Sequence, residues 1–411
     1  MKKIISCLDC GSSNIKLVVC EIFNDKLYVL ATSCIKSKGI KKGIIENKEQ
    51  AIIPIREAFE KCEKVIGQPI KKVICIVPSS HADFIISEGT TTLNSDNSYV
   101  CGDDILKSFQ ACVYNKVRSN MEFVSICPLE FIIDDKKIVN DPKAMPAKKL
   151  SVKAVVSLIP KNNLSNLFVI LEELNKEVND ICFSGLADYF EYSSKVNNGY
   201  SAVINIGGET TDISILSGNV LIASSVIFQG GSSVNRDICY AYDISLKESS
   251  YIKERFGHAV LSGVSTKEYI PVLTKSGENI KINQYQVSEI IYSRFKEILN
   301  ESKKEINLLT KKEISYIIVT GGASETCGFD EIVKEVLGNK ASLGVINEMG
   351  VRNNMFSSSL GLIKYYDYKL SFRNRVASTL SEEEQESLFT IKKKINSESI
   401  IGKIYGYFFD N

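Results

Sequence analysis

The chain has 411 residues, of which 44% are hydrophobic and 24% charged, and its formal net charge is +1 at pH 7. These values are ordinary for a globular protein, and so small a net charge gives no reason to expect nucleic acid as a partner. Only two histidines occur, His81 and His258, so neither a histidine-rich metal site nor a Ser-His-Asp triad is expected.

The twelve cysteines show no disulfide framework, which is typical of a reducing cytosol. Cys7 and Cys10 form a C-x-x-C pair, but no second pair completes a zinc site, and we interpret them as small apolar residues at a strand end. Asp9 interrupts the apolar start, and no run of 18 apolar residues exists, so neither a signal peptide nor a membrane-spanning helix is expected.

The first predicted unit is "IISCLDCGSSNIKLVV" at 4–19, an apolar strand, a Gly/Ser turn and an alternating strand. The pattern at 47–67 predicts a helix with Pro54 close to its first turn. Residues 79–160 contain short β-like runs and one helical pattern at 102–119, together with several Pro and Gly. We interpret this stretch as an inserted subdomain.

A helical pattern at 166–178 leads to "AVINIGGETTDISIL" at 202–216, which repeats the strand, turn and strand of the first unit. A repeat about half the chain apart indicates two related halves. A second helical pattern at 287–306 precedes "ISYIIVTGGASETCGF" at 314–329, a third apolar strand with a glycine turn. The chain then becomes polar at 371–398 and ends in the apolar stretch 399–411.

Tight glycine turns can bind phosphate, because their backbone N–H groups form a concave anion site and no Cβ stands in the way. Asp9 could hold Mg²⁺ through water, and Lys16 could meet a phosphate as a point charge. One such turn is a weak signal, and both the Walker A and the G-x-G-x-x-G motifs are absent. Three turns in this order, two with a shared frame, are a stronger signal.

These motifs resemble those of the actin/Hsp70/sugar-kinase superfamily, and over nearly its whole length the chain is similar to the FtsA family of bacterial cell-division proteins. "LDCGSSNIK" and "NIGGETTD" resemble the family's two phosphate motifs, and "VTGGAS" resembles its adenosine motif. "FQGGSSVNRDI" with "KESSYIKERFG", and "NDPKAMPAKKLSV" within the insert, resemble further family stretches. The insert and the apolar tail distinguish this family from other members of the superfamily.

The resemblance implies an α/β, actin-like two-lobed ATPase fold of duplicated mixed sheets with helices, an inserted α+β subdomain and a C-terminal amphipathic helix. ATP and Mg²⁺ are the implied cofactors. The implied metal residues are Asp9, through water, and Asn205, which is a weak candidate. The implied nucleotide-binding residues are Asp9, Gly11, Ser12, Ser13, Lys16, Gly207, Gly208, Thr210, Glu248, Lys253, Gly321, Gly322 and Ala323.

The same resemblance implies a division of the chain into subdomains. The expected first lobe comprises residues 1–78 and 161–198, and the insert between them comprises residues 79–160. The expected second lobe comprises residues 199–234 and 306–350, and the small subdomain between them comprises residues 235–305. These are followed by the return helix 351–370, the polar linker 371–398 and the amphipathic helix 399–411.

Two residues depart from the second phosphate motif. Asn205 stands where the family usually has Asp, and a neutral amide lacks the charge that binds Mg²⁺ well. Glu209 replaces a glycine, and its carboxylate would repel phosphate unless it points away. The family's Glu-Pro is also missing from "FSGLADYFE". We therefore expect nucleotide binding with weak or no hydrolysis.

The apolar tail predicts a short amphipathic helix. On a helical projection one stripe holds Ile400, Ile401, Ile404, Tyr405, Phe408 and Phe409. We expect this stripe to enter the headgroup boundary of the membrane, while Lys392, Lys393 and Lys394 meet anionic lipid. The alternative is a terminal helix docked on the protein's own core, but the polar linker favours a tether.

The resemblance implies an actin-like tether at the cytoplasmic face of the cell membrane, which would hold the FtsZ polymer of the Z ring at the division septum. It would self-assemble with ATP and recruit later divisome proteins through the insert, and the small subdomain would offer a surface to FtsZ. The main alternative is a small-molecule kinase of the same superfamily, for which no stretch identifies a catalytic carboxylate. A chaperone ATPase would need a substrate-binding domain, for which too little chain remains.

Overall fold

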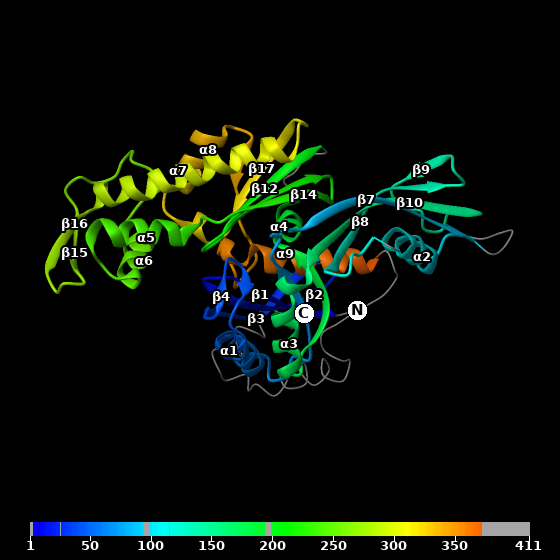
Figure 1. Cartoon of the computed structure of the whole chain (residues 1–411), viewed down its shortest axis with the longest axis horizontal. Helices are drawn as coiled ribbons and strands as arrows, with labels where there is room; N and C mark the ends of the chain where they lie inside the picture. The colour runs from blue at the N-terminus through cyan, green and yellow to red at the C-terminus, as the bar shows by residue number, and fades with distance from the viewer. Residues whose placement is uncertain (1–2, 25, 94–98, 115, 194–198, 372–411) are drawn as a thin grey trace, which may run out of the picture.

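The chain folds into two lobes that face each other, with a β-rich subdomain projecting at one end and a smaller, mostly helical one at the other (Figure 1). This computed structural model describes residues 3–24, 26–93, 99–114, 116–193 and 199–371. The expected linker and tail, from 372 onwards, lie outside the described residues.

The first lobe is built on a five-stranded mixed sheet with the order β11-β6-β1-β2-β3. Its strands are β1 (Lys3–Cys10), β2 (Asn14–Phe23), β3 (Lys26–Lys36), β6 (Lys72–Val77) and β11 (Glu177–Phe183). Antiparallel pairing joins β1 to β2 and β2 to β3, and parallel pairing joins β1 to β6 and β6 to β11. Strand β1 is buried along its length, as expected for the centre of a sheet covered on both faces.

The second lobe repeats this topology. Its sheet has the order β14-β13-β12-β17-β18, with β12 (Tyr200–Ile206), β13 (Thr211–Ser217), β14 (Val220–Ile227), β17 (Ile314–Thr320) and β18 (Ala341–Leu343). The directions match those of the first lobe strand for strand, antiparallel on one side of the centre and parallel on the other. The sequence repeat therefore marks a real structural duplication, and the predicted two-lobed α/β fold is confirmed.

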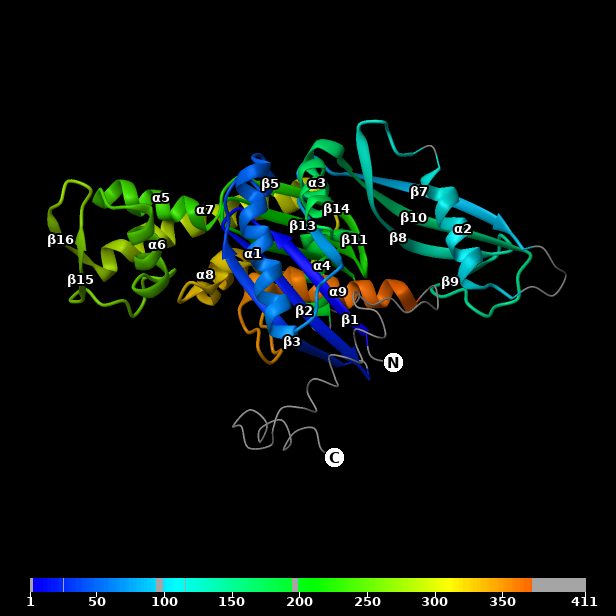
Figure 2. The same ribbon diagram turned by 90° about the horizontal axis from the view of Figure 1, so that it is seen from below.

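Helices cover the sheets. In the first lobe, α1 (Lys48–Ile66) and α3 (Ser165–Glu173) lie on one face of the sheet, and α9 (Ser357–Ser371) lies on the other (Figure 2). Helix α4 (Ser184–Tyr192) packs between α9 and the second lobe's sheet. Helix α9 crosses α4 at backbone contact, because a Cβ on Gly361 would overlap the carbonyl oxygen of Ala187. Helix α9 thus returns the chain from the second lobe to the first. No helix among the described residues is long and apolar enough to span a membrane.

The insert lies between β6 and α3 in the chain and has its own core. Its sheet has the order β7-β10-β8-β9, and helix α2 packs against it. The bounds are β7 (Asp83–Thr92), α2 (Gly102–Val113), β8 (Met121–Ile133), β9 (Lys137–Val139) and β10 (Lys149–Pro160), followed by the short η1 (Lys161–Asn163).

The small subdomain is mostly helical. It contains α5 (Gly231–Tyr242), α6 (Leu246–Arg255), the hairpin of β15 (Tyr269–Leu273) and β16 (Asn279–Asn283), and α7 (Gln284–Leu309). Helix α7 extends the predicted helix 287–306 at both ends, and the side chain of Asn283 caps its start. The remaining elements are η3 (Gly322–Glu325), α8 (Phe329–Leu337), η4 (Asn354–Phe356) and the small hairpin β4 (Ile40–Lys41) and β5 (Ile44–Ile45).

Two predicted helices are too long. The pattern at 102–119 gives a helix that ends at Val113, because Tyr114 adopts an extended ψ of 126°. The pattern at 166–178 joins a helix to a strand: α3 ends at Glu173, Asn175 turns the chain with a φ of 54°, and β11 then begins. Asparagine tolerates this left-handed conformation, which ends a helix.

Candidate functional site

A cleft of about 750 Å³ lies between the lobes, and all three predicted glycine turns line it. Each turn follows the end of a central strand, namely β1, β12 or β17. The related lobes bring the strand ends together, although the turns come from distant parts of the sequence. The predicted site residues that line the cleft are Asp9, Gly11, Ser12, Ser13, Lys16, Asn205, Gly207, Gly208, Thr210, Lys253, Gly321, Gly322 and Ala323.

The first turn joins β1 to β2, and the backbone N–H of Gly11 donates to the carbonyl oxygen of Asn14 (3.2 Å). Asp9 and Lys16 are directly opposite in the antiparallel pair, and Lys16 Nζ lies 2.6 Å from Asp9 Oδ2. Lys16 Nζ also donates to the carbonyl oxygen of Met355 (2.9 Å). The ammonium group of Lys16 is thus held at the floor of the cleft beside a carboxylate.

The second turn faces the first at close range. A Cβ on Gly208 would overlap Ser13 Oγ, so only glycine allows the two turns to approach this closely. The backbone N–H of Gly231 donates to the carbonyl oxygen of Gly207 (2.9 Å), and the backbone N–H of Ser232 donates to the carbonyl oxygen of Gly208 (2.7 Å). The start of α5 therefore fixes the second turn from behind.

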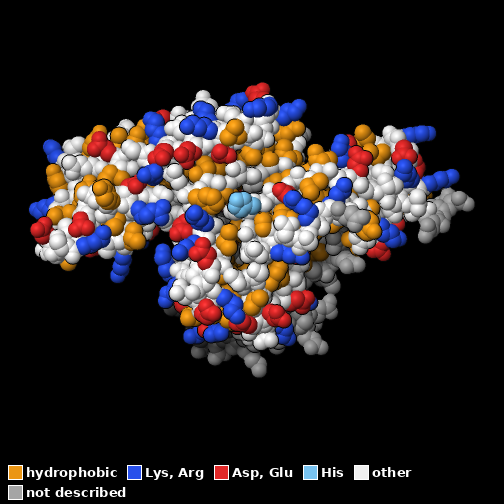
Figure 3. All heavy atoms as spheres, in the orientation of Figure 1, with side chains coloured by type: hydrophobic (Ala, Val, Ile, Leu, Met, Phe, Trp, Pro, Cys, Tyr) orange, Lys and Arg blue, Asp and Glu red, His pale blue; other side chains and the backbone are white. Residues whose placement is uncertain are grey.

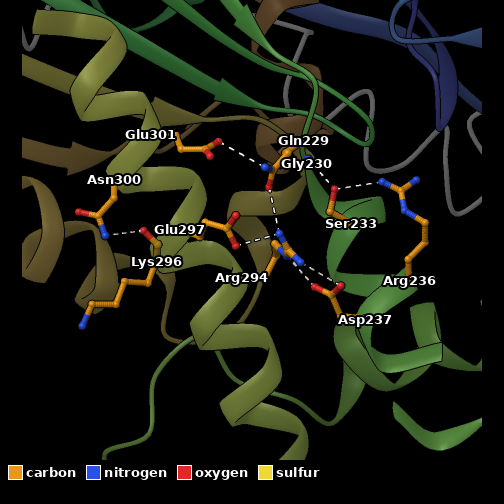
Figure 4. Close-up of polar contacts among 10 residues, drawn as sticks. All are labelled: Gln229, Gly230, Ser233, Arg236, Asp237, Arg294, Lys296, Glu297, Asn300 and Glu301. Carbon is orange, nitrogen blue, oxygen red and sulfur yellow. Dashed lines mark hydrogen bonds and ion pairs between the residues drawn. The ribbon is translucent and has the colours of Figure 1, made fainter. Parts of the chain in front are cut away.

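A polar cluster anchors α5 and α7 beside this turn (Figure 4). Arg294 on α7 donates to both carboxylate oxygens of Asp237 on α5, at 2.6 and 3.1 Å. Arg294 also donates to Gln229 Oε1 (3.3 Å), and the Gln229 side chain donates to Glu301 (3.3 Å). Since the carbonyl oxygen of Gln229 accepts from Thr211 Oγ1 (2.8 Å), the cluster joins the small subdomain to the second phosphate turn.

The third turn has a backbone that favours glycine. Gly321 has a φ of 97°, and a Cβ there would overlap Asn205 Oδ1. Gly322 and Ala323 begin the 3₁₀ turn η3, and Ala323 is packed against the start of α5.

The structure separates the two residues predicted on α6. Lys253 Nζ reaches the cleft and donates to the carbonyl oxygen of Gly231 (3.1 Å), and burial lowers the pKa of Lys253 to about 8. Glu248 is not among the residues lining the cleft. Its carboxylate instead accepts from the N–H and hydroxyl of Ser245 and caps α6. Ser250, two positions further along, lines the cleft, and a role for Glu248 in nucleotide binding stays a prediction.

Several cleft residues were not predicted. Asp212 is the most informative, because it follows the second turn and pairs across the strands with Asn205. Ser79 Oγ donates to Asp212 Oδ1 (2.8 Å), and burial raises the pKa of Asp212 to about 6. A carboxylate directly after the Gly/Thr turn, at the start of β13, was the available sequence signal. The other unpredicted charged residues of the cleft are Lys36, Lys42, Glu254, Arg255 and Glu325.

The two departures from the family motif have specific partners. Asn205 Nδ2 donates to Asp188 Oδ2 (2.6 Å) and to Ser358 Oγ (3.1 Å). Glu209 Oε2 accepts from the backbone N–H of Lys42 (2.8 Å), across the mouth of the cleft. The carboxylate of Glu209 therefore points away from the phosphate turn, which removes the expected repulsion.

The cleft fits a magnesium nucleotide. Five Lys or Arg side chains and four carboxylates line it, and the hydroxyls of Ser12, Ser13 and Thr210 add donors for phosphate oxygens. The described residues contain no group of three or more His, Cys, Asp or Glu that could hold a metal alone. A single carboxylate such as Asp9 suits Mg²⁺, which keeps several waters and binds largely through substrate phosphates.

Known proteins resemble both the two-lobed body and the insert of this chain. A family model described as "Cell division protein FtsA" matches residues 202–361, and another, described as "SHS2 domain inserted in FTSA", matches residues 79–157. The curated Cell division protein FtsA of Bacillus subtilis is 29% identical over 87% of this chain and 82% of its own length. That of Enterococcus hirae is 26% identical over the same shares.

A crystal structure of MreB5 of Spiroplasma citri bound to ADP superposes with a TM-score of 0.56. The match covers 91% of this chain and 99% of that protein at 14% sequence identity, which supports the actin-like fold alone.

Proposed function

Because the chain belongs to the FtsA family of cell-division proteins, within the actin-like superfamily, we propose that it binds ATP with Mg²⁺ between its lobes and tethers FtsZ polymers to the membrane. The observation that carries the nucleotide part is the convergence of three glycine turns, from three separate strand ends, on one cleft. Proteins bind phosphates at such turns because backbone N–H groups and hydroxyls meet there.

The roles of the cleft residues follow from their positions. Ser12, Ser13 and Thr210 would donate to phosphate oxygens, and Lys16 would meet the phosphates with its charge. Asp9 would accept from water on Mg²⁺, and the ion would neutralise phosphate charge. Gly321, Gly322 and Ala323 would lie beneath the nucleoside. We propose weak or no hydrolysis, because Asn205 offers an amide where a carboxylate would bind the metal better.

The membrane part of the proposal rests on the sequence. Its apolar stripe, Ile400, Ile401, Ile404, Tyr405, Phe408 and Phe409, lies outside the described residues. A short amphipathic helix of this kind binds reversibly at the headgroup boundary and favours anionic lipid. Self-assembly into a filament would add many such anchors and raise the overall avidity. We place the protein at the cytoplasmic face of the membrane, at the division site.

The small subdomain offers a surface for FtsZ. Hydrophobic side chains lie among charged ones over α5, α6 and the β15–β16 hairpin (Figure 3). Tyr240 is 92% exposed, and the other exposed large hydrophobic residues on α5, α6 and this hairpin are Leu246, Tyr251, Tyr269 and Leu273. Exposed tyrosines are frequent anchors in protein interfaces. The insert, at the opposite end, would serve self-assembly and recruitment of later divisome proteins.

Vesicle co-sedimentation with FtsZ tests the tether. We expect FtsZ polymers to sediment with anionic vesicles when the whole chain is present, and not with a chain lacking residues 399–411. Phe408→Glu should weaken vesicle binding by about ten- to a hundredfold, because it removes roughly 1.5–3 kcal/mol of aromatic burial. Tyr407→Glu, beside the stripe, is the matched control and should have a smaller effect.

The same samples separate the tether from a docked tail. A tether leaves the melting midpoint of the truncated chain nearly unchanged, because it adds little to the core. If truncation lowers the midpoint by several degrees while vesicle binding persists, the tail belongs to the core and the proposal is wrong.

A further inference from the structure

Asp188 is a buried carboxylate with three hydrogen-bond donors around it. It lies on α4 with 0% of its surface exposed, at the point where α4, β12 and α9 meet. Ser357 and Ser358, in the first turn of α9, donate to Asp188 Oδ1 at 2.7 and 2.8 Å. Asn205 Nδ2 donates to Asp188 Oδ2 at 2.6 Å.

All three donors are neutral groups, two hydroxyls and one amide, and they fix the position of the Asp188 carboxylate. The N-terminus of α9 adds the positive end of its dipole. In the described part of the chain, Asp188 forms these three hydrogen bonds and no ion pair with a Lys or Arg. Buried charges are normally paired or balanced by a metal, and the cleft beside Asn205 is where such a cation would lie.

The same contacts fix the orientation of the Asn205 amide. Its nitrogen points at Asp188 and Ser358, so its oxygen must point the other way. A Cβ on Gly321 would overlap that oxygen, which places it beside the third turn. Asn205 thus presents to the cleft an acceptor, the kind of atom that receives hydrogen bonds from water on a metal ion.

We propose that Asp188 is a positioning residue of the nucleotide site: it holds Asn205 with its oxygen toward the magnesium nucleotide and supplies, directly behind it, the negative charge that position 205 lacks. In this chain the carboxylate lies on α4, behind the position on β12 where the family usually has Asp. This inference rests on the proposed binding of ATP with Mg²⁺. It extends that proposal by naming a residue that does not touch the ligand.

Charge exchange between the two positions tests the inference. Asp188→Asn keeps acceptors for Ser357 and Ser358, but it allows the Asn205 amide to turn and present N–H groups to the cleft. We expect the affinity for a fluorescent ATP analogue in Mg²⁺ to fall by about 10–100-fold, as for other outer-shell partners of metal sites. The affinity measured in EDTA and the melting midpoint of the nucleotide-free protein should change little.

The exchanged pair, Asp188→Asn with Asn205→Asp, restores one carboxylate and one amide. We expect it to recover the affinity in Mg²⁺ to within about threefold, because coupled partners are compensated when both change. Asn205→Asp alone places two carboxylates in contact and should lower the melting midpoint. Asp180→Asn is the matched control: it removes a carboxylate of the same lobe that is paired with Lys369, and it should leave affinity unchanged.

Three outcomes are decisive. If Asp188→Asn binds the analogue as the natural chain does, with the same dependence on Mg²⁺, the inference is overturned while the proposed function stands. If the exchanged pair binds no better than Asp188→Asn, Asp188 has only a structural role. If the natural chain binds the analogue neither in Mg²⁺ nor in EDTA, the proposed function fails as well. Asp188→Ser provides a second charge-free variant should Asp188→Asn not fold.

Discussion

Glu191 is a buried carboxylate between α4 and α9 that shares its cation with another acid. Its Oε2 lies 3.0 Å from Lys364 Nζ, and Lys364 also pairs with Glu348 at 2.6 Å. Burial raises the pKa of Glu191 to about 7, although Lys364 acts in the opposite direction. At neutral pH the folded protein therefore binds a proton on Glu191 more readily than the unfolded chain does.

Glu191→Gln should alter how stability depends on pH. Because the pKa is higher in the folded state, the contribution of Glu191 to stability is fully present below about pH 4.5 and is lost as the pH rises through 7. The total is on the order of 3 kcal/mol. The free energy of unfolding, measured by urea denaturation at several pH values between 4.5 and 7, should fall less steeply with rising pH for Glu191→Gln than for the natural chain. The exposed control Glu177→Gln should follow the natural chain. Identical slopes for Glu191→Gln and the natural chain would contradict this account.

At the scale of elements, the β4–β5 hairpin of the first lobe contacts the second lobe at the mouth of the cleft. The backbone N–H of Lys42 donates to Glu209 Oε2 (2.8 Å), and Lys42 Nζ lies 4.6 Å from the centre of the Phe228 ring. On the other side of the hairpin, the N–H of Gly43 donates to Ser12 Oγ (2.8 Å) in the first phosphate turn. The hairpin therefore closes the cleft and also contacts the proposed phosphate site.

Removing the Glu209 acceptor should speed ligand release. A hydrogen bond of this kind contributes about 0.5–1.5 kcal/mol, so Glu209→Ala should raise the dissociation rate of a fluorescent ATP analogue by up to about tenfold. Glu209→Gln retains an acceptor oxygen and should behave more like the natural chain. Stopped-flow release measures both. Equal rates for the Ala variant and the natural chain would show that the hairpin does not hold the cleft closed.

The sequence predicts elements where the signal is local and fails where the partner is distant. Helix α7 was predictable because its apolar spacing runs for many turns, and the glycine turns were predictable because strand and turn are neighbours in the chain. The sequence did not show that the Glu248 carboxylate caps α6, because local spacing does not say which face of α6 turns toward the cleft. Asp188 gave no signal, because its partners Ser357 and Ser358 are about 170 residues away.

At the scale of the whole molecule, a nucleotide bound between the lobes would favour one closed arrangement of them. We expect that arrangement to assemble head to tail, since a contact between unlike surfaces does not close on itself. Electron microscopy of lipid monolayers should show rows of particles with ATP and fewer without it. Glu209→Ala should require more ATP for the same rows if it weakens closure. Isolated particles at every protein concentration, with ATP present, would contradict the filament proposal.

Helix α9 has a mechanical consequence. Near its C-terminal end, Lys369 pairs with Asp180 on β11 (2.6 Å) and Asp367 pairs with Lys3 on β1 (2.5 Å), so the last described turns are fastened to the first lobe's sheet. If the residues beyond α9 attach to the membrane, as we propose, a force on them would be transmitted to that sheet, which belongs to the lobe that also carries the insert. Opening of the cleft would then move the second lobe and the small subdomain, with the exposed Tyr240, relative to that attachment.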